Sequence, residues 1–319
     1  MKPEMKPAFE KRMLSLMKND EDFKKFSEII HISPRNFIRC NTIKISPENL
    51  IKKLNKKWIV EQPYENYPEI ILINQKLGPG ELGNAIEHLL GYYYIQEISS
   101  MMSAIALNPQ PGEILIDLCA SPGSKTTQMA AKMENNGTLI ANDLKMDRIA
   151  ILASNLERCG VTNQIVTKND AIGLCSKLSK NNIKFDKILL DAPCSGEGTL
   201  RSSPKTFLMW NEKVVKNLSR QQKKLLAFAL KCLKKGGTLV YSTCTHAPEE
   251  NEEVIDFALK NFPVKVEPID LPLKTRQGLA EWEGDVFNKE VEKCCRIYPQ
   301  DNDSEGFFVA KMTLLEEIK

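Results

Sequence analysis

Hydrophobic and polar positions in the second two-thirds of the chain follow two alternating periods. Short apolar runs, typical of buried strands, are separated by longer stretches with apolar residues at helical spacing, for instance 146–159 and 219–233. Strand following helix in this way predicts an α/β fold, a parallel sheet with helices on both faces. Residues 234–237 (KKGG) predict a helix stop before the last parallel strand. The predicted strands are 114–119, 138–144, 164–170, 187–191 and 238–244, with 264–269 and 307–312 as further candidates.

The first hundred residues follow a different, mixed pattern. We expect a helix over 8–30, strands at 37–41 and 69–74, a helix beginning at Ser46-Pro47-Glu48, and a helix around 92–107. The breaker-rich segment 108–112 (NPQPG) then joins this part to the regular pattern. We therefore predict a small α+β domain over 1–108 and a catalytic domain over 109–319.

Composition narrows the class of protein without naming a function. Of 319 residues, 42% are hydrophobic and 27% are charged, as in an ordinary globular protein. No apolar run is long enough to span a membrane, and the N-terminal residues lack the apolar core of a signal peptide, so we expect a cytoplasmic protein without a membrane partner. Nine cysteines without a CxxC pair suit a reducing compartment and argue against a metal site.

Charge is distributed unevenly along the chain. The net charge is only +3, but residues 1–60 carry 14 Lys and Arg against 7 Asp and Glu. Such a segment can neutralise phosphates and position an RNA. A solvated basic helix face would give the same composition, so the charge alone leaves both interpretations open.

Acidic residues follow three successive predicted strands. In open α/β sheets ligands bind beyond the carboxyl ends of the strands. Asp143, Asp170 and Asp191 each end one of these strands, and the strand before them leads into a small-residue turn around Gly123. Carboxylates at these places can accept hydrogen bonds from ribose hydroxyls and from an adenine amino group. The turn matches neither the dinucleotide nor the P-loop fingerprint, so the pattern favours a nucleoside cofactor without phosphates, such as S-adenosylmethionine.

Two cysteines follow the last two parallel strands. Cys194 lies in DAPCSG and Cys244 in YSTCT, so neighbouring strand ends would bring both thiols to the cofactor crevice. A thiolate added to carbon 6 of cytosine makes carbon 5 able to accept a methyl group, and a second thiol could help remove the carbon 5 proton. Asp191 and Lys125 are the candidates for hydrogen bonding to the base as charge develops. These considerations do not decide which thiol attacks.

Several motifs together resemble one known family. They are RCNTIK, IQEISSMM, DLCASPGSKTT, DAPCSGEGTLR, YSTCT followed by PEENE, and RIYP with a later EGFF. The chain resembles the RNA cytosine-5 methyltransferases of the Nop/Sun family, especially archaeal tRNA-modifying members. The resemblance implies a Rossmann-like class I methyltransferase sheet with an N-terminal RNA-binding domain, Cys244 as nucleophile and Cys194 as the residue assisting release. It also implies a cofactor site of Cys119, Ala120, Ser121, Pro122, Gly123, Ser124, Lys125, Asp143, Arg148, Asp170 and Asp191.

The motifs depart from the family pattern at a few positions. Ser124 stands where the commoner loop APGGKT has glycine, Glu305 replaces the usual Asp of DGFF, and Tyr298-Pro299 replaces His-Pro. None of these changes touches the proposed chemistry. We expect neither the NusB-like domain nor the PUA domain that some relatives carry, and we expect a monomer.

Alternatives remain at the level of function and substrate. We expect tRNA as the substrate, with rRNA as the alternative. A DNA cytosine-5 methyltransferase and a non-catalytic RNA-binding or ribosome-assembly factor are the competing classes; intact Cys194 and Cys244 argue against the latter. The three histidines are expected to be structural, although His246 lies near Cys244 in sequence and could touch the site.

Overall fold

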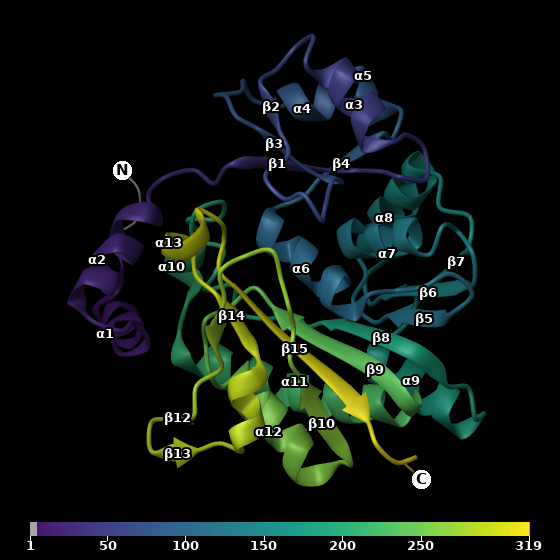
Figure 1. Ribbon diagram of the computed structural model, residues 1–319. Helices are drawn as coiled ribbons and strands as arrows, with labels where there is room; N and C mark the ends of the chain where they lie inside the picture. Colours follow the sequence, from purple (N-terminus) through teal and green to yellow (C-terminus); the bar gives the residue numbers. More distant parts are fainter. Residues whose placement is uncertain (1–4, 319) are drawn as a thin grey trace.

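A large mixed sheet with helices on both faces forms the body of the protein, and a smaller antiparallel sheet lies beside it (Figure 1). The computed structural model describes residues 5–318. The large sheet has the order β11-β14-β15-β9-β8-β5-β6-β7, and β10 pairs with β15. Its strands are β5 (Ile114–Asp117), β6 (Thr138–Asp143), β7 (Gln164–Lys168), β8 (Phe185–Asp191), β9 (Leu233–Thr243), β10 (Val264–Glu267), β11 (Arg276–Gln277), β14 (Cys295–Ile297) and β15 (Phe307–Leu314).

The five strands from β5 to β9 are parallel, as predicted. The chain moves outward from β5 through β6 to β7 and then returns to place β8 on the other side of β5. This reversal of strand order between β5 and β8 is where an open α/β sheet offers its ligand crevice. β15 extends the sheet as an antiparallel neighbour of β9, and β14 and β11 follow it.

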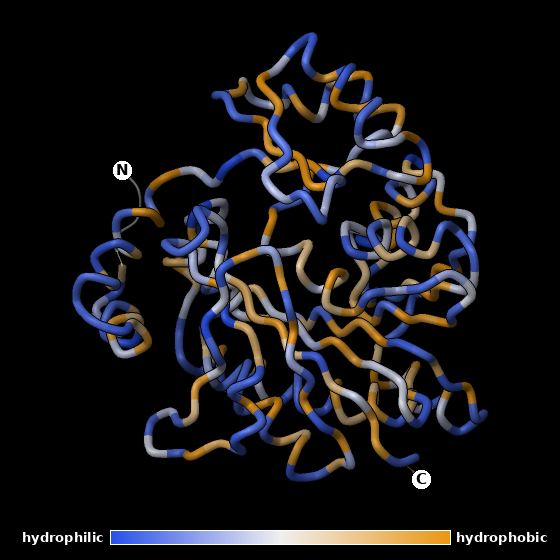
Figure 2. Tube along the Cα trace, viewed as in Figure 1, coloured by the Kyte–Doolittle hydropathy of each residue, from blue (hydrophilic) through white to orange (hydrophobic). Residues whose placement is uncertain are grey.

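Successive residues of the central strands enter two different hydrophobic cores, because side chains of a strand alternate between the faces of the sheet. Leu115, Leu189 and Val240 pack on one face, whereas Ile116 and Tyr241 pack on the other. Figure 2 shows the hydrophobic residues concentrated along these strands. The first face is covered by α6 (Ile98–Leu107), α7 (Ser124–Lys132) and α8 (Met146–Cys159), and the second by α9 (Ala171–Lys180), α11 (Glu212–Lys231) and α12 (Glu252–Asn261).

The N-terminal region contains two separately packed parts. Its four strands have the order β2-β3-β1-β4 and share a core with α3, whose N-cap is Ser46 as predicted. The first two helices lie apart from that sheet, beside α10 and α13 (Figure 1), and share a core with Phe207, Trp210 and Tyr298. These elements are α1 (Pro7–Leu16), α2 (Asp20–Ile29), β1 (Asn36–Cys40), α3 (Pro47–Leu54), β2 (Val60–Glu61), β3 (Ile70–Ile73), α4 (Glu81–Asn84), α5 (Ile86–Leu89), β4 (Tyr93–Ile95), α10 (Thr206–Met209) and α13 (Pro299–Asn302).

Three local predictions were wrong. The helix expected over 8–30 is broken between α1 and α2, where Asn19 caps α2. The helix expected around 92–107 begins only at Ile98, because Glu97 caps α6 there and the preceding residues pair with β1 as β4. The strand expected from 238 starts at Leu233, which pairs with Phe185 of β8. Residues 234–237 (KKGG) therefore belong to β9.

Several short elements of the C-terminal part were not predicted. They have too few residues to show a hydrophobic period. The unpredicted elements include β11, β14, β12 (Glu281–Trp282), β13 (Asp285–Val286) and the 3-10 helix η1 (Lys289–Lys293).

Among residues 5–318 no helix is long and apolar enough to cross a membrane. The domain boundary at 108/109 and the cytoplasmic location stay predictions.

Candidate active site

Two cavities lie at the carboxyl ends of the parallel strands, on either side of the turn that links β5 to α7. The first has a volume of about 260 Å³ and contains the ends of β6 and β7. Four predicted cofactor residues line it: Cys119, Asp143, Arg148 and Asp170. The remaining lining residues are Leu118, Asn142, Leu144, Lys145, Asn169, Ala171, Pro193, Gln221 and Leu225.

Asp143 is held in place by the segments on both sides of it. Its Oδ2 accepts a hydrogen bond from the Ser121 backbone N–H at 3.3 Å, and its Oδ1 accepts from Lys145 N–H at 3.2 Å. Arg148 Nε lies 3.2 Å from Oδ2 and its Nη2 donates to the Ser121 carbonyl at 2.6 Å. Asp170 has a second task, since its Oδ2 caps α9 by accepting from Gly173 N–H at 2.9 Å.

The turn after β5 brings backbone close to this cavity. Gly123 has φ +104°, a conformation that L residues rarely adopt, and a Cβ there would lie 3.1 Å from Leu152 Cδ1. Ala120, Ser121 and Gly123 line neither cavity and instead shape the turn. Burial raises the pKa of the Cys119 thiol, so this cysteine lines the cavity as a protonated thiol.

The second cavity has a volume of about 440 Å³ and contains three of the four predicted catalytic residues, Lys125, Asp191 and Cys244. It lies between the N-terminal sheet and the large sheet, because residues of β1, β4, α6, α7 and β15 all line it. The other lining residues are Pro34, Arg35, Asn36, Phe37, Ile95, Gln96, Glu97, Ser99, Ser100, Pro122, Ser124, Thr199, Ser202, Glu305, Gly306 and Phe307.

The Asp191 carboxylate is fixed by hydrogen bonds from both sides. Lys125 Nζ lies 2.8 Å from Oδ2 and also donates to Ser100 Oγ at 2.9 Å. Ser242 Oγ donates to Oδ1 at 2.7 Å and accepts from Ser103 Oγ at 2.9 Å. Burial alone would lower the pKa of Lys125, but Asp191 outweighs it and raises that pKa, so the ammonium is kept charged. We did not predict the three serines, although they lie in the ISSMMS and STC segments.

The two thiols lie next to each other, as predicted. Cys194 Sγ and Cys244 Sγ are 3.2 Å apart. The hydrogen bond to Cys244 raises the pKa of Cys194 well above its usual range, and burial raises it further. Cys244 lines the second cavity, whereas Cys194 does not. Cys194 is therefore the thiol that keeps its proton, and Cys244 is the one that faces the open space.

The loops that carry the thiols interlock through backbone contacts. Gly198 N–H donates to the Cys244 carbonyl at 2.9 Å, and Ser195 N–H donates to Glu250 Oε2 at 3.0 Å. A Cβ at Gly198 would lie 2.3 Å from the Gly306 carbonyl oxygen, so only glycine permits this approach. Burial raises the pKa of Glu250 to about 7. Glu250 belongs to the PEENE motif, but its contact with the Cys194 loop joins residues distant in sequence and was not predicted.

His246 does not reach either cavity. Its ring stacks on Tyr298 with centroids 4.9 Å apart, and its backbone carbonyl accepts from Arg296 Nη2 at 3.0 Å. Burial lowers the pKa of His246 to about 3, so the ring is neutral. The structural interpretation of His246 fits these contacts.

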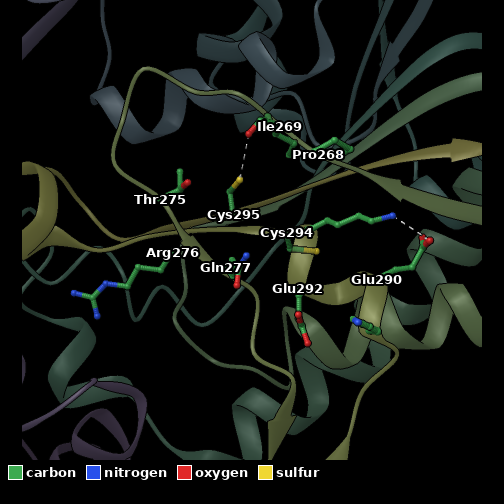
Figure 3. A pocket seen from close by; sticks show the side chains of 11 residues that line it. Pro268, Ile269, Thr275, Arg276, Gln277, Glu290, Glu292, Cys294 and Cys295 are labelled. Carbon is green, nitrogen blue, oxygen red and sulfur yellow. Dashed lines mark hydrogen bonds and ion pairs between the residues drawn. The ribbon is translucent and has the colours of Figure 1, made fainter.

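A third cavity, with a volume of about 530 Å³, is larger than the other two and lies along β11 and β14 (Figure 3). Neither Cys194 nor Cys244 lines it. Lys293 and Glu290, which line it, pair with each other at 3.1 Å. Cys294 and Cys295 on its wall are free thiols.

Across residues 5–318 no three His, Cys, Asp or Glu side chains form a group suited to a metal ion. The expected absence of a metal stays a prediction.

Comparison with known proteins agrees with this geometry. Residues 104–313 match the family described as 16S rRNA methyltransferase RsmB/F, and residues 5–98 match the N-terminal domain of 16S rRNA methyltransferase RsmF. The chain is 42% identical over 303 residues to a tRNA (cytosine(49)-C(5))-methyltransferase of Pyrococcus abyssi, covering 95% of each chain. It is 37% identical over 315 residues to ribosomal RNA small subunit methyltransferase F of Psychromonas ingrahamii, but spans 63% of that protein's length.

Solved structures show the same architecture over almost the whole chain. A methyltransferase homologue from Pyrococcus horikoshii is 34% identical, with a TM-score of 0.82 and coverage of 98% of this chain and 100% of the other. The structure of NSun6 from the same organism, solved with SFG, is 25% identical, with a TM-score of 0.83 and 98% coverage of both chains. The α/β methyltransferase fold predicted from the sequence is confirmed.

Proposed function

The chain belongs to the RsmB/F family of RNA cytosine-5 methyltransferases, and on that premise we propose that it methylates carbon 5 of a cytosine in tRNA with Cys244 as nucleophile. The observation that carries the assignment is the second cavity, which Cys244 lines together with Asp191 and Lys125. A thiol, a carboxylate and an ammonium in one space are the groups that covalent activation of cytosine requires.

Each residue has a task that its surroundings suit. The Cys244 thiolate adds to carbon 6. As negative charge develops on the ring, N3 takes up a proton, and the Asp191 carboxylate accepts hydrogen bonds from that N3–H and from the amino group, while Lys125 holds Asp191 in position. Carbon 5 then carries the electron density that accepts the methyl group. Cys194 takes part after transfer. Once the Cys244 sulfur is bonded to carbon 6, it no longer holds the proton on Cys194, and Cys194 releases that proton to solvent. The Cys194 thiolate then removes the proton from carbon 5, so that the electron pair reforms the 5,6 double bond and expels Cys244 as a thiolate.

The first cavity fits S-adenosylmethionine. Asp143 offers a fixed carboxylate for the ribose hydroxyls, and Asp170 would accept a hydrogen bond from an adenine amino group. No phosphate-binding fingerprint accompanies them. When bound, the cofactor supplies the electrophilic methyl group. Cys119 and Arg148 complete the wall of this cavity.

Sequence similarity favours tRNA over rRNA as the substrate. The chain is 42% identical to the tRNA enzyme of Pyrococcus abyssi and 37% identical to the rRNA enzyme of Psychromonas ingrahamii. We infer that the N-terminal part contributes to RNA binding, since residues 1–60 have an excess of seven positive charges. Methylation of rRNA is the second candidate.

Nucleoside mass spectrometry tests this proposal. Unmodified tRNA and unmodified small-subunit rRNA are incubated with S-adenosylmethionine and either the wild type or Cys244→Ala, with Cys232→Ala as a matched buried-cysteine control. We expect 5-methylcytosine in tRNA with the wild type and Cys232→Ala, and none with Cys244→Ala. The mark in rRNA alone would replace the substrate, and no mark in either RNA would contradict the enzymatic function.

A further inference from the structure

One arginine of the first helix contacts both segments that follow the catalytic cysteines. Arg12 lies on α1 and is 8% exposed. Its guanidinium pairs with Glu249, with Nη1 2.9 Å from Oε1 and Nη2 bonded to Oε2. Its Nε lies 3.5 Å from Glu197 Oε1. Glu197 is three residues beyond Cys194, and Glu249 is five residues beyond Cys244.

The two carboxylates need a cation between them. Glu197 is fully buried, and burial raises its pKa while Arg12 opposes that shift. Burial alone would also raise the pKa of Glu249, but the pairing with Arg12 outweighs it and lowers that pKa. Without Arg12, two buried carboxylates on adjoining loops would repel each other. The Trp210 indole N–H, 2.7 Å from Glu197 Oε1, carries no compensating charge.

Cys194 lies farther from its strand than Cys244 does, three residues beyond Asp191 at the end of β8. Cys244 directly follows β9, whose last residue Thr243 pairs with Phe308 of β15. Residues 192–205 form no helix or strand and rest on the second segment through Ser195 and Gly198. Repulsion between Glu197 and Glu249 would therefore move Cys194 away from a Cys244 that stays in place.

From this arrangement we propose that Arg12 is a positioning residue, which holds the Cys194 loop against the Cys244 segment so that product is released. The inference rests on the proposed function, in which Cys194 removes the carbon 5 proton. When Cys194 is displaced, Cys244 still attacks and the methyl group is still transferred, but the covalent bond from Cys244 to carbon 6 persists. Arg12 thus makes an N-terminal helix part of the release step.

The test measures trapped adduct as well as turnover. Wild type, Arg12→Met, Arg12→Gln and Arg12→Lys are incubated with tRNA and S-adenosylmethionine, and protein–RNA adduct surviving denaturing electrophoresis is quantified beside kcat and KM. A displacement of about 1 Å can lower kcat by up to about 100-fold. We expect Arg12→Met to lose between about 10- and 100-fold in kcat and to accumulate several-fold more adduct. The KM for tRNA should fall together with kcat, because the slowed step follows methyl transfer. Arg12→Lys should recover part of the loss.

Arg276→Met is the matched control. Arg276 also anchors an N-terminal helix, through Asp22 of α2 at 2.5 Å and Asp301 of α13 at 2.6 Å, but it contacts neither Glu197 nor Glu249. This variant should leave the adduct at the wild-type level. Arg12→Gln, which removes the positive charge but keeps a hydrogen-bond donor, is the test variant if Arg12→Met does not fold.

Two results would overturn the inference. One is a fall in activity without more adduct in the Arg12→Met and Arg12→Gln variants; the other is an equal rise of adduct in Arg276→Met. Both leave the proposed function standing if the wild type makes 5-methylcytosine. A wild type that makes none, and a Cys194→Ala variant that traps no RNA, would instead remove the proposed function itself.

Discussion

Replacing Ser242 by alanine removes the hydrogen bond that orients the Asp191 carboxylate. Ser242 Oγ donates to Asp191 Oδ1 at 2.7 Å and accepts from Ser103 Oγ at 2.9 Å, and both serines are fully buried. In Ser242→Ala, Asp191 keeps Lys125 on Oδ2 but loses its partner on Oδ1. The carboxylate can then rotate away from the edge of the base.

The magnitude follows from the charge of the acceptor. A hydrogen bond to a charged group contributes about 1.5–3 kcal/mol. Where that contribution is expressed in the transition state, it equals about 10- to 100-fold in rate. Ser103→Ala should cost much less, under about threefold, because Ser242 still donates to Asp191 in that variant. The double variant should match Ser242→Ala alone, since Ser103 acts only through Ser242.

The assay is initial-rate methyl transfer at saturating tRNA and S-adenosylmethionine for the wild type, both single variants and the double variant. Thermal denaturation of each variant separates lost activity from lost folding. Equal losses in Ser103→Ala and Ser242→Ala, or a Ser242→Ala enzyme with the kcat of the wild type, would refute the reasoning.

Three other changes have expected outcomes. Asp143→Ala removes the carboxylate for the ribose hydroxyls and should weaken S-adenosylmethionine binding by about 100-fold in calorimetry, whereas exposed Asp147→Ala on α8 should not; similar affinities for the two variants would contradict the cofactor site. Glu250 has a folded-state pKa of about 7 against an ordinary 4.5, so the stability linked to its proton is full below pH 4.5 and is lost as the pH rises to 7. Between pH 5 and 8 the wild type should therefore lose about 3 kcal/mol of unfolding free energy relative to Glu250→Gln, read from urea titrations, and parallel pH curves would count against this. Arg39 donates to the Ser124 carbonyl at 2.7 Å and to Thr127 Oγ1 at 2.8 Å, so Arg39→Met should lower the unfolding free energy by about 3 kcal/mol; a loss below about 1 kcal/mol would show that this clamp contributes little.

The parallel sheet was predictable because its strands are buried on both faces and read as continuous apolar runs. The ends of these strands placed Asp143, Asp170 and Asp191 correctly at one edge of the sheet. Cys194 and Cys244 also met as expected, since β8 and β9 are neighbours. The resemblance was needed to choose between the two thiols and to name Arg148 and the residues of the cofactor loop.

Contacts between distant segments could not be predicted in the same way. Ser103 reaches Ser242 across 139 residues, and Arg12 reaches Glu249 across 237. Neither pairing leaves a period or a spacing in the sequence. The break after α1 and the late start of α6 have a related cause, because the caps at Asn19 and Glu97 override a continuous hydrophobic pattern.

Peptide mapping of the trapped RNA tests the central claim most directly. Cys194→Ala is incubated with tRNA and S-adenosylmethionine, the adduct is digested with nuclease and protease, and the modified cysteine is located by mass spectrometry. Our account predicts a 5-methyl-5,6-dihydrocytidine fragment bonded through carbon 6 to Cys244. A fragment attached to any other cysteine, or a Cys244→Ala enzyme that traps RNA through Cys194, would contradict it.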